Sequence, residues 1–280
     1  MRRTSRLSLA ALILLIPPGS MSQSESVAIK PTQTIHVFDG KSLEPFDSWL
    51  VDLKRTDPDR VFSVVDRIDG APAIRVSGQH YGGLITKQRY RDYRLVVEYR
   101  WGAATWKPRR DQARDNGVLL HCQGRPGNYA KDFNGPWMRS IELQIIEGGV
   151  GDILLVGGYD EKGELHRPSL TAKTRKGRNG GTFFDPKGEA GQHSSQRINW
   201  WGRSEDWVDK LGFRGPSDPD SPGQEWTRIE AVVDGGHLAY YVNGTLVNEA
   251  SECSLQEGKL LFQSEGAEIY FRRIDLEPLK

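Results

Sequence analysis

The stretch MRSIELQIIEGGVGDILLVGG, residues 138–158, alternates aliphatic side chains with an acid and an amide. Such alternation is typical of a β-strand, because successive side chains of a strand point to opposite faces of its sheet. Ile141, Leu143 and Ile145 would then face a hydrophobic core, while Glu142 and Gln144 would project from the other face. The stretch therefore predicts a strand whose second face carries polar groups of unknown purpose.

The rest of the chain continues as short β-rich runs separated by turn residues, with almost no helical periodicity. The clearest local signal is AYYVNGTLVN, in which Asn243-Gly244 suits the type I′ turn of a β-hairpin. Many short strands and few helices predict an all-β fold in which two antiparallel sheets pack face to face, as in a sandwich or jelly roll.

The first 22 residues have the composition of a secretory signal peptide, with three arginines before an apolar run from Leu7 to Ile16. This run is shorter than the roughly 20 apolar residues that span a bilayer. We therefore expect an exported protein, periplasmic or secreted, with no membrane span after cleavage; an uncleaved N-terminal anchor is the alternative.

The expected organisation after the signal peptide is a linker at 23–34 and one domain at 35–280. Within that domain, residues 159–224 are rich in glycine, proline and charge, and they predict a long loop insertion. Such loops tend to be functional or partly ordered.

Charge and cysteine content exclude some classes of protein. Without the three arginines of the signal peptide, 35 of the 38 basic residues stand against 37 acidic ones, a net charge of −2. This balance gives no reason to expect nucleic acid or an acidic membrane surface as a partner. The two cysteines, Cys122 and Cys253, are too few for a disulfide framework, and we expect buried thiols, with a bridge left open.

The same alternation occurs in two preceding runs, YRLVVEYRW and NGVLLHC. It places Glu98 and Arg100 on the polar face of the first run, and His121 on that of the second. Because consecutive strands are often neighbours, these groups would converge with Glu142 and Gln144 on one patch. The patch could act as general base, general acid or metal site, or it could be an ordinary solvated sheet face with a Glu–Arg pair.

Aromatic residues in the predicted loop suggest a sugar surface, because the C–H face of a pyranose stacks on exposed rings. Trp200, Trp201 and Trp207 lie there. The alternative is that they anchor the loop to the sandwich.

Several runs together resemble the bacterial 3-keto-disaccharide hydrolase family over roughly residues 35–280. They are NGVLLHCQG, WMRSIELQIIEGGVGDILLVGG, EWTRIEAVVDGGHLAYYVNGTLVNEA and GKLLFQSEGAEIYFRRIDLEPL. The resemblance implies a concanavalin A-like sandwich and hydrolysis or elimination of 3-keto-glycosides through removal of the proton at carbon 2. A non-catalytic carbohydrate-binding domain and a conventional glycosidase are the alternatives.

On that mechanism, Glu142 and His121 are the central acid–base candidates and Glu98 is a further carboxylate. The candidates for substrate binding are Gln144, Arg139, Arg100, Trp137, Trp200, Trp201 and Glu265. Acid, imidazole and amide oxygen together can also bind a divalent metal ion, so a metal cofactor is left open.

Overall fold

The computed structural model describes residues 26–280, and every regular element in that part is a β-strand. The predicted signal peptide lies outside the described residues. Among residues 26–280 no helix is long and apolar enough to cross a membrane.

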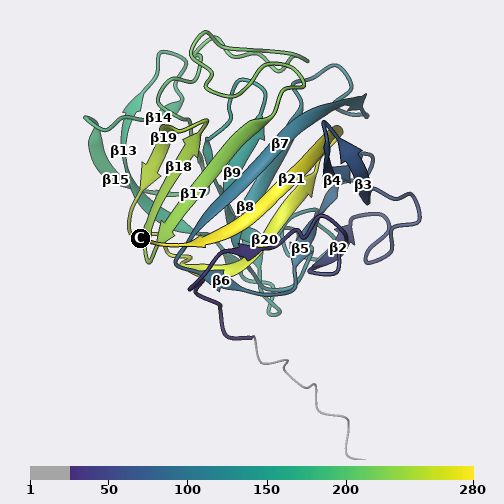
Figure 1. Cartoon of the computed structure of the whole chain (residues 1–280). Helices are drawn as coiled ribbons and strands as arrows, with labels where there is room; N and C mark the ends of the chain where they lie inside the picture. The colour runs from purple at the N-terminus through teal and green to yellow at the C-terminus, as the bar shows by residue number, and fades with distance from the viewer. Residues whose placement is uncertain (1–25) are drawn as a thin grey trace, which may run out of the picture.

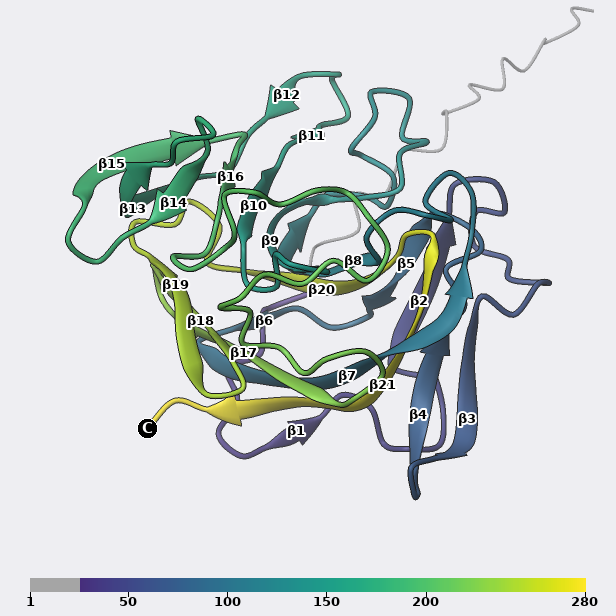
Figure 2. The same ribbon diagram turned by 90° about the horizontal axis from the view of Figure 1, so that it is seen from above.

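Two large antiparallel sheets lie face to face (Figures 1 and 2). The first contains, in spatial order, β19 (Thr245–Ala250), β18 (His237–Val242), β17 (Thr227–Asp234), β7 (Tyr93–Thr105), β21 (Ala267–Pro278), β4 (Ala71–Val76) and β3 (Phe62–Ile68), with β1 (Ile35–His36) paired to β21. The second contains β16 (Arg197–Ile198), β10 (Ile153–Val156), β9 (Arg139–Ile146), β8 (Asp115–Gln123), β20 (Glu257–Ser264), β5 (Gly82–Thr86) and β2 (Phe46–Leu50), with β6 (Tyr90–Arg91) paired to β20. The expected all-β sandwich of two antiparallel sheets is confirmed.

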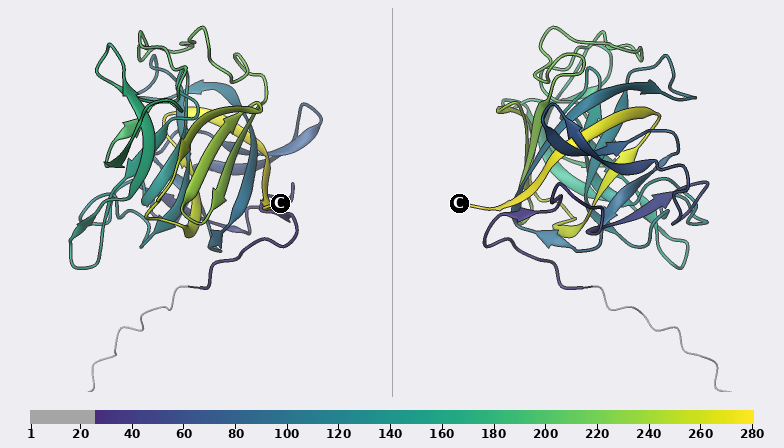
Figure 3. Two further views of the ribbon diagram at one scale, coloured as in Figure 1. Left: turned by 90° about the vertical axis from the view of Figure 1, so that its left-hand side faces the viewer. Right: turned by 45° about the vertical axis from the view of Figure 1, so that its right-hand side comes forward.

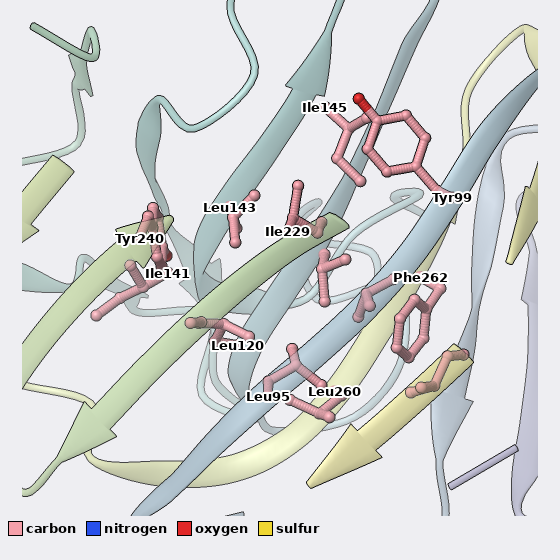
Figure 4. Packing of buried hydrophobic residues seen from close by; sticks show 14 of the residues in the cluster. Leu95, Tyr99, Leu120, Ile141, Leu143, Ile145, Ile229, Tyr240, Leu260 and Phe262 are labelled. Atoms are coloured by element: carbon pink, nitrogen blue, oxygen red, sulfur yellow. The ribbon is translucent and has the colours of Figure 1, made fainter. Parts of the chain in front are cut away.

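The core lies between the sheets. Ile141, Leu143 and Ile145 of β9 face Leu95 and Ile229 of the opposite sheet, and all of them are at most 2% exposed (Figure 4). Burial of one such side chain contributes about 1.5–3 kcal/mol to stability. The alternation in the opening stretch thus orients β9, and its even-numbered residues point outward.

The Asn243-Gly244 turn joins β18 to β19 as predicted. Both residues have positive φ, 46° and 80°. A type I′ turn needs this conformation at both central positions.

Residues 159–224, expected as a loop, contain further strands. A hairpin pairs β11 (Gly158–Tyr159) with β12 (Leu165–His166), and a small sheet pairs β14 (Thr182–Phe184) and β15 (Glu189–Ser194) with β13 (Ser169–Lys176). Their sequences, such as SLTAKTRK and EAGQHS, are polar and largely exposed, so they lack the apolar alternation that reveals a strand.

Residues 199–226 contain no strand and run over one end of the sandwich (Figure 3). Trp200 is 1% exposed, within the core. The indole N–H of Trp207 donates to the carbonyl of Glu147 at 2.8 Å. These two tryptophans therefore anchor the segment, as the alternative interpretation held.

Candidate functional site

The outer face of the second sheet carries a cleft of about 540 Å³. Strands β8, β9, β10 and β20 meet there with β16, the β11–β12 hairpin and the loop before β9. The lining residues are Asp115, Tyr129, Trp137, Glu142, Gln144, Leu154, Leu155, Val156, Gly157, Tyr159, Leu165, Arg167, Ser195, Gln196, Arg197, Gln263 and Glu265. A volume of this size is typical of small-molecule sites.

Three carboxyl groups from different parts of the chain share this cleft. Asp115 begins β8, Glu142 lies in the middle of β9, and Glu265 directly follows β20. Asp115 and Glu142 are 6% and 3% exposed, so the face that carries them is not a solvated one. We call Asp115, Glu142 and Glu265 the acid trio.

Gly117 makes room for the trio. A Cβ atom at this position would lie 2.2 Å from Oε1 of Glu142 and 2.7 Å from Oε1 of Gln263. Any side chain there would collide with the carboxyl group, so the glycine lets Glu142 lie flat against β8.

Burial and mutual repulsion raise the pKa values of the three carboxyl groups. Burial, then the charge of Asp115, raises the pKa of Glu142 to about 8. Burial raises the pKa of Asp115 to about 6, against the opposing effect of Arg109 and Arg197. The pKa of Glu265 is well above its ordinary value, from burial first and from the two other carboxyls next. Near neutral pH the cleft therefore holds protonated and ionised carboxyl groups together, as acid–base catalysis requires.

The trio has few fixed partners. Glu265 makes no hydrogen bond or ion pair with any residue in the part described. Asp115 has one ion pair, in which Nη2 of Arg109 lies 3.4 Å from Oδ2, while its Oδ1 is buried without a partner. Carboxyl groups in this state remain available to a ligand.

Arg197 supplies a fixed positive charge at the cleft. Its Nη1 donates to Oδ2 of Asp152 at 2.9 Å, and Asp152 is fully buried and also paired with Arg203. Arg197 is therefore held by its partner and lowers the pKa of Glu142 and Asp115 from a set position.

Gln144 presents a donor to the cleft. Its Oε1 accepts the backbone N–H of Ile145 at 3.0 Å, which leaves the amide NH₂ free to donate. Gln144 can thus bind a hydroxyl or ketone oxygen of a ligand.

The lining also includes apolar and aromatic side chains. Trp137 is 8% exposed and packs against Tyr81, with ring centroids 6.2 Å apart. Tyr129 is 50% exposed. Rings next to carboxyl and amide groups are the combination that sugar sites use.

His121 does not reach this cleft, so its expected position beside Glu142 is wrong. A β-bulge interrupts β8 between Leu120 and Gln123, where His121 has a φ of 55°. The bulge turns the imidazole into the space between the sheets, where it packs on Tyr93 and its Nδ1 lies 3.0 Å from the carbonyl of Leu255. Burial lowers its pKa to about 4.

Glu98 and Arg100 lie on the far side of the molecule, which corrects the prediction of one shared patch. Their strand, β7, belongs to the first sheet and is not a neighbour of β8. Glu98 bonds Nε of Arg272 at 2.6 Å, and Arg100 pairs with Asp69. The alternative interpretation, an ordinary sheet face with a Glu–Arg pair, is the correct one for these residues.

Three other predicted residues lie outside the cleft lining. Arg139 begins β9 on the face opposite to Glu142, next to Gly158. Trp200 is in the core, and Trp201, 43% exposed, lines a separate hollow with Phe184 and Leu246. Of the predicted binding residues, Gln144, Trp137 and Glu265 line the cleft; their roles stay predictions.

The described residues contain one group of three metal-type ligands, Asp160, Glu164 and His166, with their ligand atoms within 4.8 Å of one another. The carboxylate of Asp160 already accepts the backbone N–H groups of Lys162 and Glu164 and bonds His166. These contacts close a hairpin loop and do not argue for a metal.

Sequence reasoning missed Asp115 and Arg197. The expected strand began at Asn116, one residue too late, although a strand starting at Asp115 would have placed this acid on the same face as Gly117. Arg197 lies in a two-residue strand with no periodicity of its own.

Comparison with known proteins gives a family match. Residues 33–277 match the model of a family described as the 3-keto-alpha-glucoside-1,2-lyase-like domain. A provisionally assigned glycosyl hydrolase from Parabacteroides distasonis is 15% identical, with a TM-score of 0.48 and coverage of 89% of this chain and 94% of that one. A carbohydrate-binding module from Bacillus subtilis is 11% identical, with a TM-score of 0.39 and coverage of 77% and 91%. No curated protein sequence matches.

Proposed function

This chain belongs to the 3-keto-alpha-glucoside-1,2-lyase-like family, and on that premise we propose that its cleft eliminates the carbon 1 substituent of 3-keto-glycosides. The observation that carries the proposal is the acid trio. Its carboxyl groups have raised pKa values and lie in one cleft with aromatic rings and an amide group, which suit a sugar. A ketone at carbon 3 makes the carbon 2 hydrogen acidic, so a carboxylate can serve as the base.

The reaction needs one base and one acid, and the trio offers both. Asp115, mostly ionised near neutral pH, takes the proton from carbon 2. The electron pair of that C–H bond forms the enolate, and the bond between carbon 1 and the glycosidic oxygen then breaks. Glu142, protonated near neutral pH, gives its proton to the departing oxygen. The products are the free alcohol and a 1,2-unsaturated 3-keto sugar.

Fixed donors would lower the barrier by stabilising the enolate oxygen. Arg197, held by Asp152, and the free amide NH₂ of Gln144 both line the cleft. Addition of water to the unsaturated sugar would then give the free 3-keto sugar, with the two carboxyl groups exchanging roles.

The test offers the purified protein a phenyl 3-keto-α-glucoside and the matching unoxidised glucoside in D₂O. We expect phenol release from the keto substrate alone, and deuterium at carbon 2 of the hydrated sugar. Release from the unoxidised glucoside would instead indicate a conventional glycosidase. Sugar binding without turnover would indicate a non-catalytic binding domain.

Three variants locate the chemistry. Glu142→Gln and Asp115→Asn should each lower kcat/KM by about 10²-fold or more. Glu98→Gln, which makes the same change to a carboxyl group on the opposite side of the sandwich, is the matched control and should be as active as the wild type.

Export stays a prediction, which N-terminal sequencing of the protein from expressing cells would check.

A further inference from the structure

The β11–β12 hairpin presents a distinctive face to the cleft. Tyr159 and Leu165 are partners across the hairpin, and Arg167 follows Leu165 by two residues. All three line the cleft. The hairpin therefore adds an apolar pair and one guanidinium group to a site whose other half is acidic.

Arg167 forms no ion pair with the three acids of the same hairpin, Asp160, Glu161 and Glu164. Asp160 is bonded to His166, at 2.9 Å, and its pKa falls to about 2. The carboxylate of Glu164 has an oxygen within 4.8 Å of the ligand atoms of Asp160 and His166. Glu161 pairs with Arg125, with 3.6 Å between Oε2 and Nη1. Asp160 and Glu161 thus have other partners, and Glu164 is grouped with Asp160 and His166.

No described residue neutralises Arg167 from elsewhere either. Arg197, the other arginine of the lining, is bonded to Asp152. Arg167 makes no ion pair or hydrogen bond with residues 26–280 and is exposed at the cleft. It is a guanidinium group with all of its donors free, which suits bidentate binding of a carboxylate.

Apolar groups of the same cleft are also uncovered. Tyr129 is 50% exposed and Leu165 37% exposed, and both border the same cleft. A flat ring could lie on them, because ring faces pack on exposed aromatic and aliphatic surface.

We propose that the leaving-group half of the substrate is a ring that carries a carboxylate, and that Arg167 binds this carboxylate while Tyr129, Tyr159 and Leu165 hold the ring. The proposal rests on the proposed function, since it assigns the sugar to the acid trio and the leaving group to the hairpin. Arg167 is then a specificity residue and takes no part in the proton transfers.

The experiment compares two matched pairs of substrates. The first is the 4-carboxyphenyl 3-keto-α-glucoside and its uncharged carboxamide. The second is a 3-keto-disaccharide whose leaving sugar is glucuronic acid, against one whose leaving sugar is glucose. For the wild type, we expect kcat/KM to favour the acid of at least one pair by about tenfold, since a hydrogen bond to a charged group has about that effect. The pair that shows the preference tells whether an aromatic ring or a sugar carries the acid.

Variants test whether the preference for the acidic substrate comes from Arg167 or from the overall electrostatic potential of the protein. Arg167→Gln should abolish the preference, mainly through KM for the acidic substrate, and Arg167→Lys should keep part of it. Arg178→Gln changes an arginine that pairs with Asp206 outside the cleft lining, and it should keep the full preference. Equal kcat/KM for the acidic and the uncharged substrate in both pairs, or a preference that persists in Arg167→Gln, would overturn the proposal.

A binding measurement keeps the two proposals distinguishable. Calorimetry with 4-hydroxybenzoate and 4-hydroxybenzamide, the leaving groups themselves, requires no turnover. Tighter binding of the acid to the wild type but not to Arg167→Gln would support the assignment even if no 3-keto-glycoside reacts, a result that would sink the proposed function alone. Equal binding of both compounds, together with equal turnover, contradicts the assignment.

Discussion

Glu142 and Arg197 lie in one row across three strands of the second sheet. Glu142 of β9 is the partner of Leu154 of β10, and Leu154 is the partner of Arg197 of β16. The positive charge of Arg197 lowers the pKa of Glu142 and so opposes the burial that raises it to about 8. The spacing of the strands thus sets how readily the acid gives up its proton.

The pH dependence of turnover should be bell-shaped. Activity should rise as Asp115 ionises near pH 6 and fall as Glu142 loses its proton near pH 8, although the two groups titrate as a coupled unit. Arg197→Gln should move the alkaline limb to higher pH, because the charge that favours ionisation of Glu142 is gone. The measurement is kcat/KM from about pH 5 to about pH 9; a profile without an alkaline limb would contradict the role given to Glu142.

Glu142→Gln should stabilise the protein at alkaline pH. The folded state holds the proton of Glu142 more tightly than the unfolded state, because the pKa rises from 4.5 to about 8 on folding. The wild type therefore loses stability as pH rises between those values, whereas glutamine does not titrate. We expect a gain of about 1–2 kcal/mol at pH 9 and a much smaller one near pH 5, from urea denaturation. A gain that is equal at both pH values would show that ionisation is not its cause.

Gly117→Ala should impair activity far more than stability. The added methyl group would meet Oε1 of Glu142 at 2.2 Å, and the far end of that side chain can move aside. We expect kcat/KM to fall by about 10²-fold and the free energy of unfolding by about 1–3 kcal/mol. Gly191→Ala is the control, because its Cβ would meet only His193, at 4.0 Å. Comparable loss of activity in both variants would argue against displacement of Glu142.

His121→Asn should leave kcat/KM within about twofold of the wild type, because the imidazole faces the core. Asparagine tolerates the positive φ of this position better than most residues. The lost packing on Tyr93 should lower the free energy of unfolding by about 1–3 kcal/mol, measured by thermal and urea denaturation. A folded variant without activity would restore the role that the sequence predicted for His121.

Local pattern predicted the fold well, because alternation and turn chemistry are properties of a few adjacent residues. Ile141, Leu143 and Ile145 alternate with polar neighbours, and Asn243-Gly244 fits one turn type. The polar strands β13 and β15 lack such alternation, and their order depends on pairing with each other. Both cysteines are free and buried, as expected.

The site was predictable only in part, because it depends on which strands become neighbours. Glu142, Gln144, Trp137 and Glu265 were found, since they lie in or next to the recognisable strands. Glu98 was misplaced because the chain passes from one sheet to the other between β7 and β8, and no feature of the sequence marks that change.

The β-bulge at His121 divides β8 into two halves of opposite phase. Before it, odd-numbered residues face the cleft side, with Asp115 and Gly117 at the acid trio and Leu119 beyond them. After it, the even-numbered Cys122 takes that side and joins Leu119, Trp137 and Met138 in a small apolar cluster. One inserted residue thus changes which side chains of β8 reach the outer face. That face carries charged groups at one end of the strand and a hydrophobic patch at the other.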